Sequence, residues 1–243
     1  TEIYTLSLHD ALPISPDLAP AVLVDGPGGD DLLLDPGPAW KSARTIRWLR
    51  SRGVDRLGGL WLTAADAAHA GAAPEILARI PVGTIRRTAD PGRSRTVRAL
   101  LDEWTAAGRD IGHLAAGGGG VLSGGAAWDA FHPDPRVAYA RAADGAAVVR
   151  IGRGSQAVLF AGPAAAPACG ALATGPFDPG ATVVVMDREP GSGDAGWIAA
   201  ASASRVVVRP PPDGFHSTLG ADGAAPSGVR IERPDGPWSL DLR

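Results

Sequence analysis

Leu57-Gly-Gly-Leu-Trp-Leu-Thr-Ala-Ala-Asp-Ala-Ala-His-Ala-Gly-Ala-Ala-Pro74 is the segment with the clearest structural pattern in this 243-residue sequence. The apolar run from Leu60 to Leu62 predicts a strand, and Thr63 leads it into a turn of small residues that contains one Asp and one His. A helical segment follows at Pro74. A strand that delivers such a loop to the edge of a sheet is a place where many hydrolases hold metal.

The composition predicts a globular chain with many turns. Hydrophobic residues make up 45% and charged residues 20%, and 33 Gly and 22 Pro interrupt short apolar runs. The length fits one large α/β domain or two small ones. A net charge of -3 gives no general attraction to nucleic acid, so any phosphate contact would be local.

Two simple features limit the chemistry and the location. Cys169 is the only cysteine, which excludes an intrachain disulfide and a cysteine-based zinc site. No apolar run approaches the roughly 20 residues that a membrane helix needs. We therefore expect the chain as given to be soluble, and the sequence does not assign its compartment.

Residues 1–15 differ from the remainder because they lack its Ala, Gly, Pro, Arg and Asp bias. They resemble the peptide that results from translating a sequencing adapter, so we expect a non-native or disordered segment; the alternative is a genuine edge strand or tail. Residues 16–243 are expected to form a single domain.

Local patterns predict hairpins and meanders mixed with helices. The runs Ala21 to Val24 and Leu32 to Leu34 read as a hairpin, and helices are expected over Ser42 to Arg52 and from Ser94 to about Ala107. Closely spaced runs predict antiparallel strands at 111–114, 121–122, 127–131, 147–151 and 157–160, followed by a βαβ unit over 182–208 and a final hairpin over 228–242. This order favours an α/β (α+β) fold in which sheets pack together with helices outside.

The loop after Thr63 offers only part of a metal site. A hydrolytic site needs three or four converging His or carboxylate ligands, and a loop spaced His-x-His/Asp-x-Asp-His supplies several of them at once. In this sequence those positions are Ala64, Asp66, Ala68 and His69, of which only Asp66 and His69 can coordinate a metal.

An ordered series of motifs resembles the metallo-β-lactamase fold, and specifically the C-terminal domain of competence DNA-uptake proteins of the ComEC type. The family loop reads Thr-His-Pro-Asp-x-Asp-His-x-Gly-Gly, and the series covers about residues 21–243. Its pieces here are Asp35-Pro-Gly-Pro38, the segment 60–72, Phe131-His-Pro133, Ala143-Asp-Gly145 and Val158-Leu-Phe-Ala-Gly-Pro163. The resemblance implies a four-layer αβ/βα sandwich of two mixed sheets, and a metal-dependent nuclease in an intact relative.

The departures from the family pattern fall on the metal positions. Ala64 and Ala68 stand where ligands are usual, Pro163 stands at the bridging-carboxylate position, and Glu189-Pro-Gly-Ser192 replaces a His-His-Gly-Ser segment. Two protein ligands hold zinc weakly, so we expect no bound cofactor and no hydrolysis. The resemblance then implies a structural or interaction role, with the membrane channel of the same parent protein and DNA as partners.

Two alternatives stay open. An active mononuclear hydrolase of the nuclease or phosphodiesterase class would hold zinc or another divalent metal through Asp66, His69 and His216, with Asp35 nearby; otherwise Asp66 caps its loop and His69 bonds a backbone carbonyl. A nucleic-acid-binding module would use basic side chains, for which the candidates are Arg44, Arg47, Arg86 and Arg87. The Gly-x-Gly-x-x-Gly match at 191–196 is read as accidental, and no dinucleotide is expected.

Overall fold

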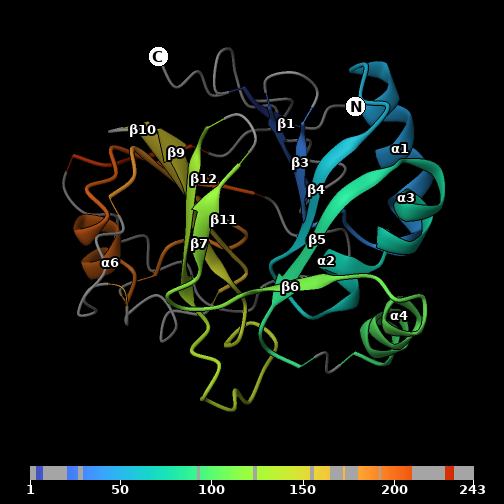
Figure 1. The fold of residues 1–243 in the computed structure, drawn as a ribbon. Helices are drawn as coiled ribbons and strands as arrows, with labels where there is room; N and C mark the ends of the chain where they lie inside the picture. Colours follow the sequence, from blue (N-terminus) through green and yellow to red (C-terminus); the bar gives the residue numbers. More distant parts are fainter. Residues whose placement is uncertain are drawn as a thin grey trace.

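The computed structural model describes residues 4–7, 21–26, 30–91, 94–122, 125–153, 156–164, 172, 180–191, 193–209 and 228–232. Two β-sheets face each other and helices cover their outer sides (Figure 1). Both sheets are mixed, so the predicted α+β class and the four-layer arrangement are confirmed.

The first sheet has six strands in the order β1-β2-β3-β4-β5-β6. All neighbours are parallel except β2 and β3, which form the predicted hairpin. The strands are β1 (Tyr4–Ser7), β2 (Val22–Asp25), β3 (Leu32–Leu34), β4 (Leu57–Leu62), β5 (Val82–Thr88) and β6 (Ile111–Leu114).

The second sheet has seven strands in the order β13-β12-β11-β10-β9-β8-β7. Its first half is parallel and its second half antiparallel. The strands are β7 (Gly119–Val121), β8 (Ala127–His132), β9 (Val148–Arg153), β10 (Gln156–Gly162), β11 (Val183–Met186), β12 (Arg205–Val208) and β13 (Arg230–Glu232).

Helices lie on the outer faces because alternate residues of each strand point outward and are apolar. Figure 1 shows α1, α3 and α4 beside the first sheet and α6 beside the second. These helices are α1 (Ser42–Ser51), α3 (Ala73–Arg79), α4 (Arg95–Ala106) and α6 (Ala195–Ala200), with the short η1 (Ala39–Lys41) and α2 (Ala67–Ala70) in the loops after β3 and β4. Trp104 is buried in the outer core of the first sheet, and Trp197 in that of the second.

A third core fills the space between the sheets. Val22, Trp61, Trp128 and Phe160 all belong to it, so both sheets contribute their inner faces. Fully burying a large apolar side chain contributes about 1.5–3 kcal/mol, which makes this shared core the main connection between the two halves.

One predicted pairing is wrong. Ile111–Leu114 was expected among antiparallel neighbours, but β6 lies parallel to β5 in the first sheet. The reason is α4, which carries the chain back to the starting end of β5 and thus makes a crossover connection. The other short runs, from β7 to β10, are antiparallel as predicted.

At the two ends of the chain the outcome is mixed. Tyr4–Ser7 pairs with β2, although residues 1–15 were expected to be non-native or disordered. That residues 1–15 derive from a sequencing adapter stays a prediction. β13 lies parallel to β12, and the expected hairpin partner at 238–242 falls outside the described residues. Among the described helices, none is long and apolar enough to span a membrane.

Candidate functional site

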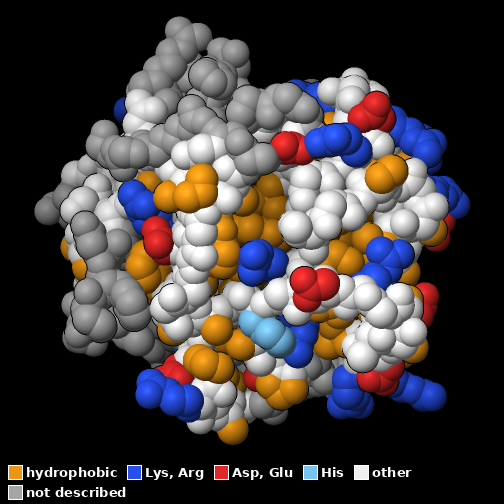
Figure 2. Space-filling view, viewed as in Figure 1, with side chains coloured by type: hydrophobic (Ala, Val, Ile, Leu, Met, Phe, Trp, Pro, Cys, Tyr) orange, Lys and Arg blue, Asp and Glu red, His pale blue; other side chains and the backbone are white. Residues whose placement is uncertain are grey.

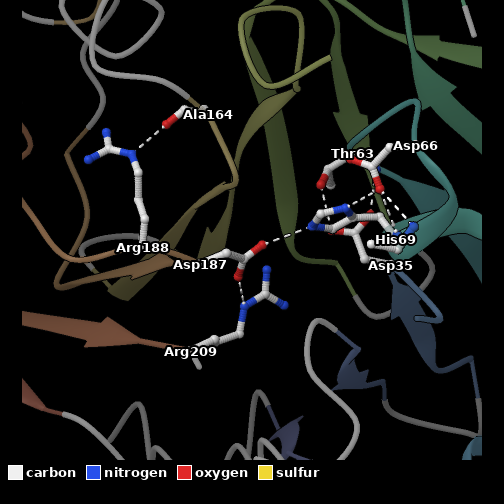
Figure 3. Close-up of polar contacts among 9 residues, drawn as sticks. Asp35, Thr63, Asp66, His69, Ala164, Asp187, Arg188 and Arg209 are labelled. Carbon is white, nitrogen blue, oxygen red and sulfur yellow. Dashed lines mark hydrogen bonds and ion pairs between the residues drawn. The ribbon is translucent and has the colours of Figure 1, made fainter. Parts of the chain in front are cut away.

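The ends of strands from both sheets deliver a cluster of charged side chains to one edge of the sandwich (Figure 3). Asp35 follows β3, and the loop with Asp66 and His69 follows β4. Asp187 follows β11 and Arg209 follows β12; these two strands are parallel and in register, so both residues emerge at the same edge. Asp35, Asp66, His69, Asp187 and Arg209 are called the charged cluster below.

Asp66 shapes the loop that follows β4. It is the N-cap of α2, and its carboxylate accepts hydrogen bonds from the backbone N–H groups of Ala68 and His69 at 2.9 and 3.0 Å. The predicted capping role of Asp66 is therefore confirmed. Burial would raise the pKa of Asp66, but the charge of His69 and these hydrogen bonds outweigh it and leave that pKa lowered.

His69 lies between two carboxylates rather than against a backbone carbonyl, so that part of the prediction is wrong. Its Nδ1 is 2.6 Å from Asp66 Oδ1, and its Nε2 is 3.2 Å from Asp187 Oδ2. Burial alone would lower the pKa of His69, but the carboxylates of Asp66, Asp187 and Asp35 raise it to about 10. His69 is thus an imidazolium at neutral pH, and each of its ring nitrogens donates to a carboxylate.

Arg209 supplies a second buried cation. The residue is only 1% exposed, and its Nε donates to Asp187 Oδ1. Burial would raise the pKa of Asp187, but Arg209 and His69 together lower it. Asp187 therefore stays ionised and binds one cation with each oxygen (Figure 3).

Asp35 holds the ends of β3 and β4 together. Its two oxygens accept hydrogen bonds from the backbone N–H and the hydroxyl of Thr63 at 2.7 and 2.5 Å. Its φ is positive, at 48°, a conformation that Asp and Asn tolerate better than most residues. Burial raises the pKa of Asp35, although His69, Arg209 and Thr63 act in the opposite direction.

The residues present do not fit a hydrolytic metal centre. A metal ligand must offer a lone pair, and both nitrogens of His69 are already hydrogen-bonded to carboxylates. The buried guanidinium of Arg209 places a fixed positive charge on Asp187, the carboxylate that His69 also contacts. Within the described ranges, no group of three or more His, Cys, Asp or Glu residues is arranged to hold a metal ion.

Positions where the resemblance expects ligands are occupied by small or cyclic apolar residues. Ala64 is buried in the outer core of the second sheet, and Ala68 is buried in α2. Pro163 is half-buried in the turn after β10. His216, the proposed third ligand, lies outside the described residues, so its convergence with Asp66 and His69 stays a prediction.

The sequence reasoning missed Asp187 and Arg209. Each is the first residue after a short buried strand with an apolar end, Val183–Met186 and Arg205–Val208. A charged residue at the C-terminal end of a parallel strand was the signal that could have identified them, because such ends meet at one edge of a sheet.

His132, in the motif Phe131-His-Pro133, contacts the backbone of a second motif segment. It is buried, and its Nε2 donates to the carbonyl of Asp144 at 2.6 Å. This contact joins the segments 131–133 and 143–145, both of which carried the sequence resemblance.

The four basic candidates for nucleic-acid contact do not share one surface. Arg44 and Arg47 lie on α1, outside the first sheet. Arg86 and Arg87 follow each other on β5 and so point to opposite faces of that sheet. Arg86 lies over the ring of Trp128 between the sheets, whereas Arg87 donates to the carbonyls of Thr88 and Asp90.

The glycine segment at 191–196 contains a structural carboxylate. Asp194 is fully buried and accepts from Arg188, from Trp197 Nε1 and from the backbone N–H of Gly191. Arg188 in turn donates to the carbonyl of Ala164, which links this loop to the turn after β10 (Figure 3).

Comparison with solved structures identifies the fold. The metallo-beta-lactamase fold protein YhfI from Bacillus subtilis matches with a TM-score of 0.57 at 12% identity over 91% of both chains. Zn(2+)-bound PqqB from Methylobacterium extorquens matches with a TM-score of 0.53 at 15% identity, over 91% of this chain and 87% of its own. CmlA, a diiron beta-hydroxylase from Streptomyces venezuelae, matches with a TM-score of 0.56 at 16% identity, over 96% of this chain and 54% of its own.

These likenesses show the metallo-β-lactamase fold and nothing finer, because the identities are low. No protein-family model matches the sequence, and no curated protein does so either.

Proposed function

We propose that this chain is a metallo-β-lactamase-fold domain in which an internal ion-pair network stands in place of a metal centre. The domain then has a structural or interaction role and does not catalyse hydrolysis. By its sequence resemblance, we also propose that it is the C-terminal domain of a ComEC-type protein of DNA uptake.

The observation that carries the first proposal is the buried pair of Arg209 and Asp187. Removing two charges from water costs several kcal/mol per ion, and a protein recovers this only when the charges are paired and hydrogen-bonded. Asp187 is paired on both oxygens, with Arg209 on one and His69 on the other. Entry of a divalent cation would have to displace at least one of these cations from a site closed to solvent.

The charges of the cluster support the same conclusion. Asp66 and Asp187 have lowered pKa values and are ionised, which balances the charges of His69 and Arg209. Asp35 has a raised pKa and is held by Thr63. A hydrolytic site instead needs excess negative charge to attract a metal, and the metal then activates water.

The ComEC assignment is supported by the order of the motifs together with the shared fold. The loop with Asp66 and His69 follows β4, and the piece Val158 to Pro163 covers most of β10, whose last residue, Gly162, lies beside Thr63, so two distant motifs reach one edge of the sandwich. In such a protein, this domain would contribute a folded surface to the channel or to DNA on its way through.

Hydrolysis is tested with bis(p-nitrophenyl) phosphate and with single-stranded DNA, each in the presence of Zn²⁺ or Mn²⁺. We expect no turnover above that of a variant carrying Asp66→Ala and His69→Ala. Metal-dependent turnover that this variant loses would overturn the proposal and would favour the mononuclear hydrolase.

The role in DNA uptake needs its own experiment in the bacterium that encodes the chain. Deletion of the segment that encodes residues 21–243 is expected to lower the uptake of labelled DNA, because the partner surface is lost. Unchanged uptake after deletion would contradict the ComEC assignment and would leave the question of metal binding untouched.

A further inference from the structure

A cleft of about 490 Å³ opens between the two sheets, near the N-terminal ends of β4 and β5 and beside the β7–β8 hairpin. Its lining runs along β4 from Leu57 to Trp61 and along β5 from Val82 to Arg86, and Asp30 also lies on it. Figure 2 shows a hollow in this face, with hydrophobic side chains inside it and basic side chains beside it. Its volume lies in the range of roughly 300–1,000 Å³ that is typical of small-molecule sites.

Two tryptophans form the apolar wall of the cleft. Trp61 of β4 and Trp128 of β8 make an edge-to-face pair with ring centroids 5.1 Å apart and an angle of 66°. Each indole has an N–H group, and neither donates to any residue in the described part of the chain. A wall of this kind offers a flat apolar surface and additional hydrogen-bond donors.

Arg86 places a positive charge over that wall. Its guanidinium carbon is 4.7 Å from the centroid of the Trp128 ring, and its position on β5 is level with Trp61 of β4. No carboxylate or carbonyl of the described residues accepts a hydrogen bond from it. A guanidinium has five N–H donors and stays charged at all relevant pH values.

A glycine on the neighbouring strand leaves the space that this guanidinium occupies. Gly112 of β6 is level with Arg86, and a Cβ atom there would come 2.7 Å from Arg86 Nη1. The side chain therefore lies between a bare backbone on one side and an indole ring on the other. This arrangement positions the donors before any ligand binds, which reduces the entropy lost on binding.

The remaining charges of the cleft leave it positive. Arg56 pairs with Asp30 at the rim, so these two charges cancel, and among the described residues of the lining Arg86 carries the remaining charge. A carboxylate or a phosphate is the group that a guanidinium binds with two parallel hydrogen bonds. We infer that this cleft binds a small organic anion with a flat apolar ring, the ring lying against Trp61 and Trp128 and the anionic group at Arg86.

Isothermal titration calorimetry with three probes separates the parts of this inference. The probe 2-naphthoate carries both the ring and the anion, 2-naphthylmethanol carries only the ring, and inorganic phosphate carries only the anion. We expect 2-naphthoate to bind one per chain, at least about tenfold more tightly than either of the others. No binding of 2-naphthoate at millimolar concentration, or equal binding of 2-naphthylmethanol, would overturn the inference.

Variants identify the residues. Arg86→Met keeps the aliphatic stem and removes the charge, and we expect it to weaken 2-naphthoate at least about tenfold. Arg47→Met, an exposed position on α1, is the matched control and should leave the affinity unchanged. An affinity within twofold of the parent protein for Arg86→Met would contradict the assignment.

A second pair of variants covers the case in which Arg86→Met fails to fold. Val121 lines the cleft from β7 and is 72% exposed, so substitution there should not disturb the core. Val121→Asp adds a negative charge, which repels the carboxylate of 2-naphthoate. We expect the affinity for 2-naphthoate to be severalfold lower in this variant than in Val121→Asn, whose side chain has nearly the same shape. Equal affinities for these two variants would also contradict an anion site.

Discussion

Arg209 and Asp187 form an ion pair at the junction of the two sheets, with side-chain exposures of only 2% and 9%. The same carboxylate also binds His69, which comes from a loop of the other sheet. This contact therefore connects the two halves of the sandwich.

Replacing Arg209 tests the energetic role of this pair. Arg209→Met leaves the buried Asp187 with His69 as its one remaining charged partner among the described residues, and we expect the free energy of unfolding to fall by about 3–5 kcal/mol. Urea denaturation measures the change, with exposed Arg98→Met on α4 as the control. In the double variant with Asp187→Asn, part of the loss should return, because the uncompensated charge is gone; equal stability of Arg209→Met and the parent would refute the role.

The protonation of His69 predicts how stability depends on pH. Its pKa is raised from an ordinary value of 6.5 to about 10 in the folded state, so the folded chain binds this proton more tightly than the unfolded chain. The stabilisation is complete below pH 6.5 and is lost as the pH rises from 6.5 towards 10. We expect the free energy of unfolding to decrease over this interval more in the parent protein than in His69→Gln.

Chemical denaturation at several pH values between 6 and 10 measures this difference. Other groups that titrate at alkaline pH affect both proteins equally, so the comparison isolates His69. Parallel stability curves for the two proteins would show that His69 does not carry the raised pKa.

Asp35 should be needed for the junction of β3 and β4. Asp35→Ala leaves the buried N–H and hydroxyl of Thr63 without their acceptor, and we expect a loss of about 2–4 kcal/mol. Asp35→Asn retains one acceptor oxygen and tolerates the φ of 48°, so it should cost clearly less. If thermal unfolding showed the same loss of stability for both variants, the hydrogen bonds to Thr63 could not explain that loss.

Asp194 is expected to be structural in spite of its position in a glycine-rich segment. Asp194→Ala removes the acceptor of Arg188, Trp197 and Gly191, and we expect about 3–5 kcal/mol of destabilisation in urea. Glu189→Ala, two residues before Gly191, is the control for a change of charge in the same loop. A change below about 1 kcal/mol for Asp194→Ala would contradict its structural role.

Much of the fold could be predicted from local sequence patterns. The hairpin of β2 and β3, the helices α1 and α4, and the βαβ unit of β11, α6 and β12 each depend on periodicity and turn residues within one short segment. The pairing of β6 could not be read in this way, because it depends on the crossover through α4 rather than on the spacing of apolar runs.

The candidate site could be predicted only in part for a similar reason. Asp66 caps its own loop, which is a local interaction and was predicted. The second carboxylate at His69 belongs to Asp187, which is 118 residues away, and no local pattern connects the two. Arg209 was missed because a basic residue after a strand is ordinary in sequence, and its meaning comes from the burial that the fold imposes.

Metal content is the most direct test of the account, because a pre-existing network of His69 and Arg209 should exclude a divalent ion. The purified domain is incubated with Zn²⁺, Mn²⁺ and Fe²⁺ in turn, dialysed without chelator, and measured by inductively coupled plasma mass spectrometry. We predict far less than one metal per chain, at the same level as in the variant with Asp66→Ala and His69→Ala. One metal per chain that this variant loses would contradict the account.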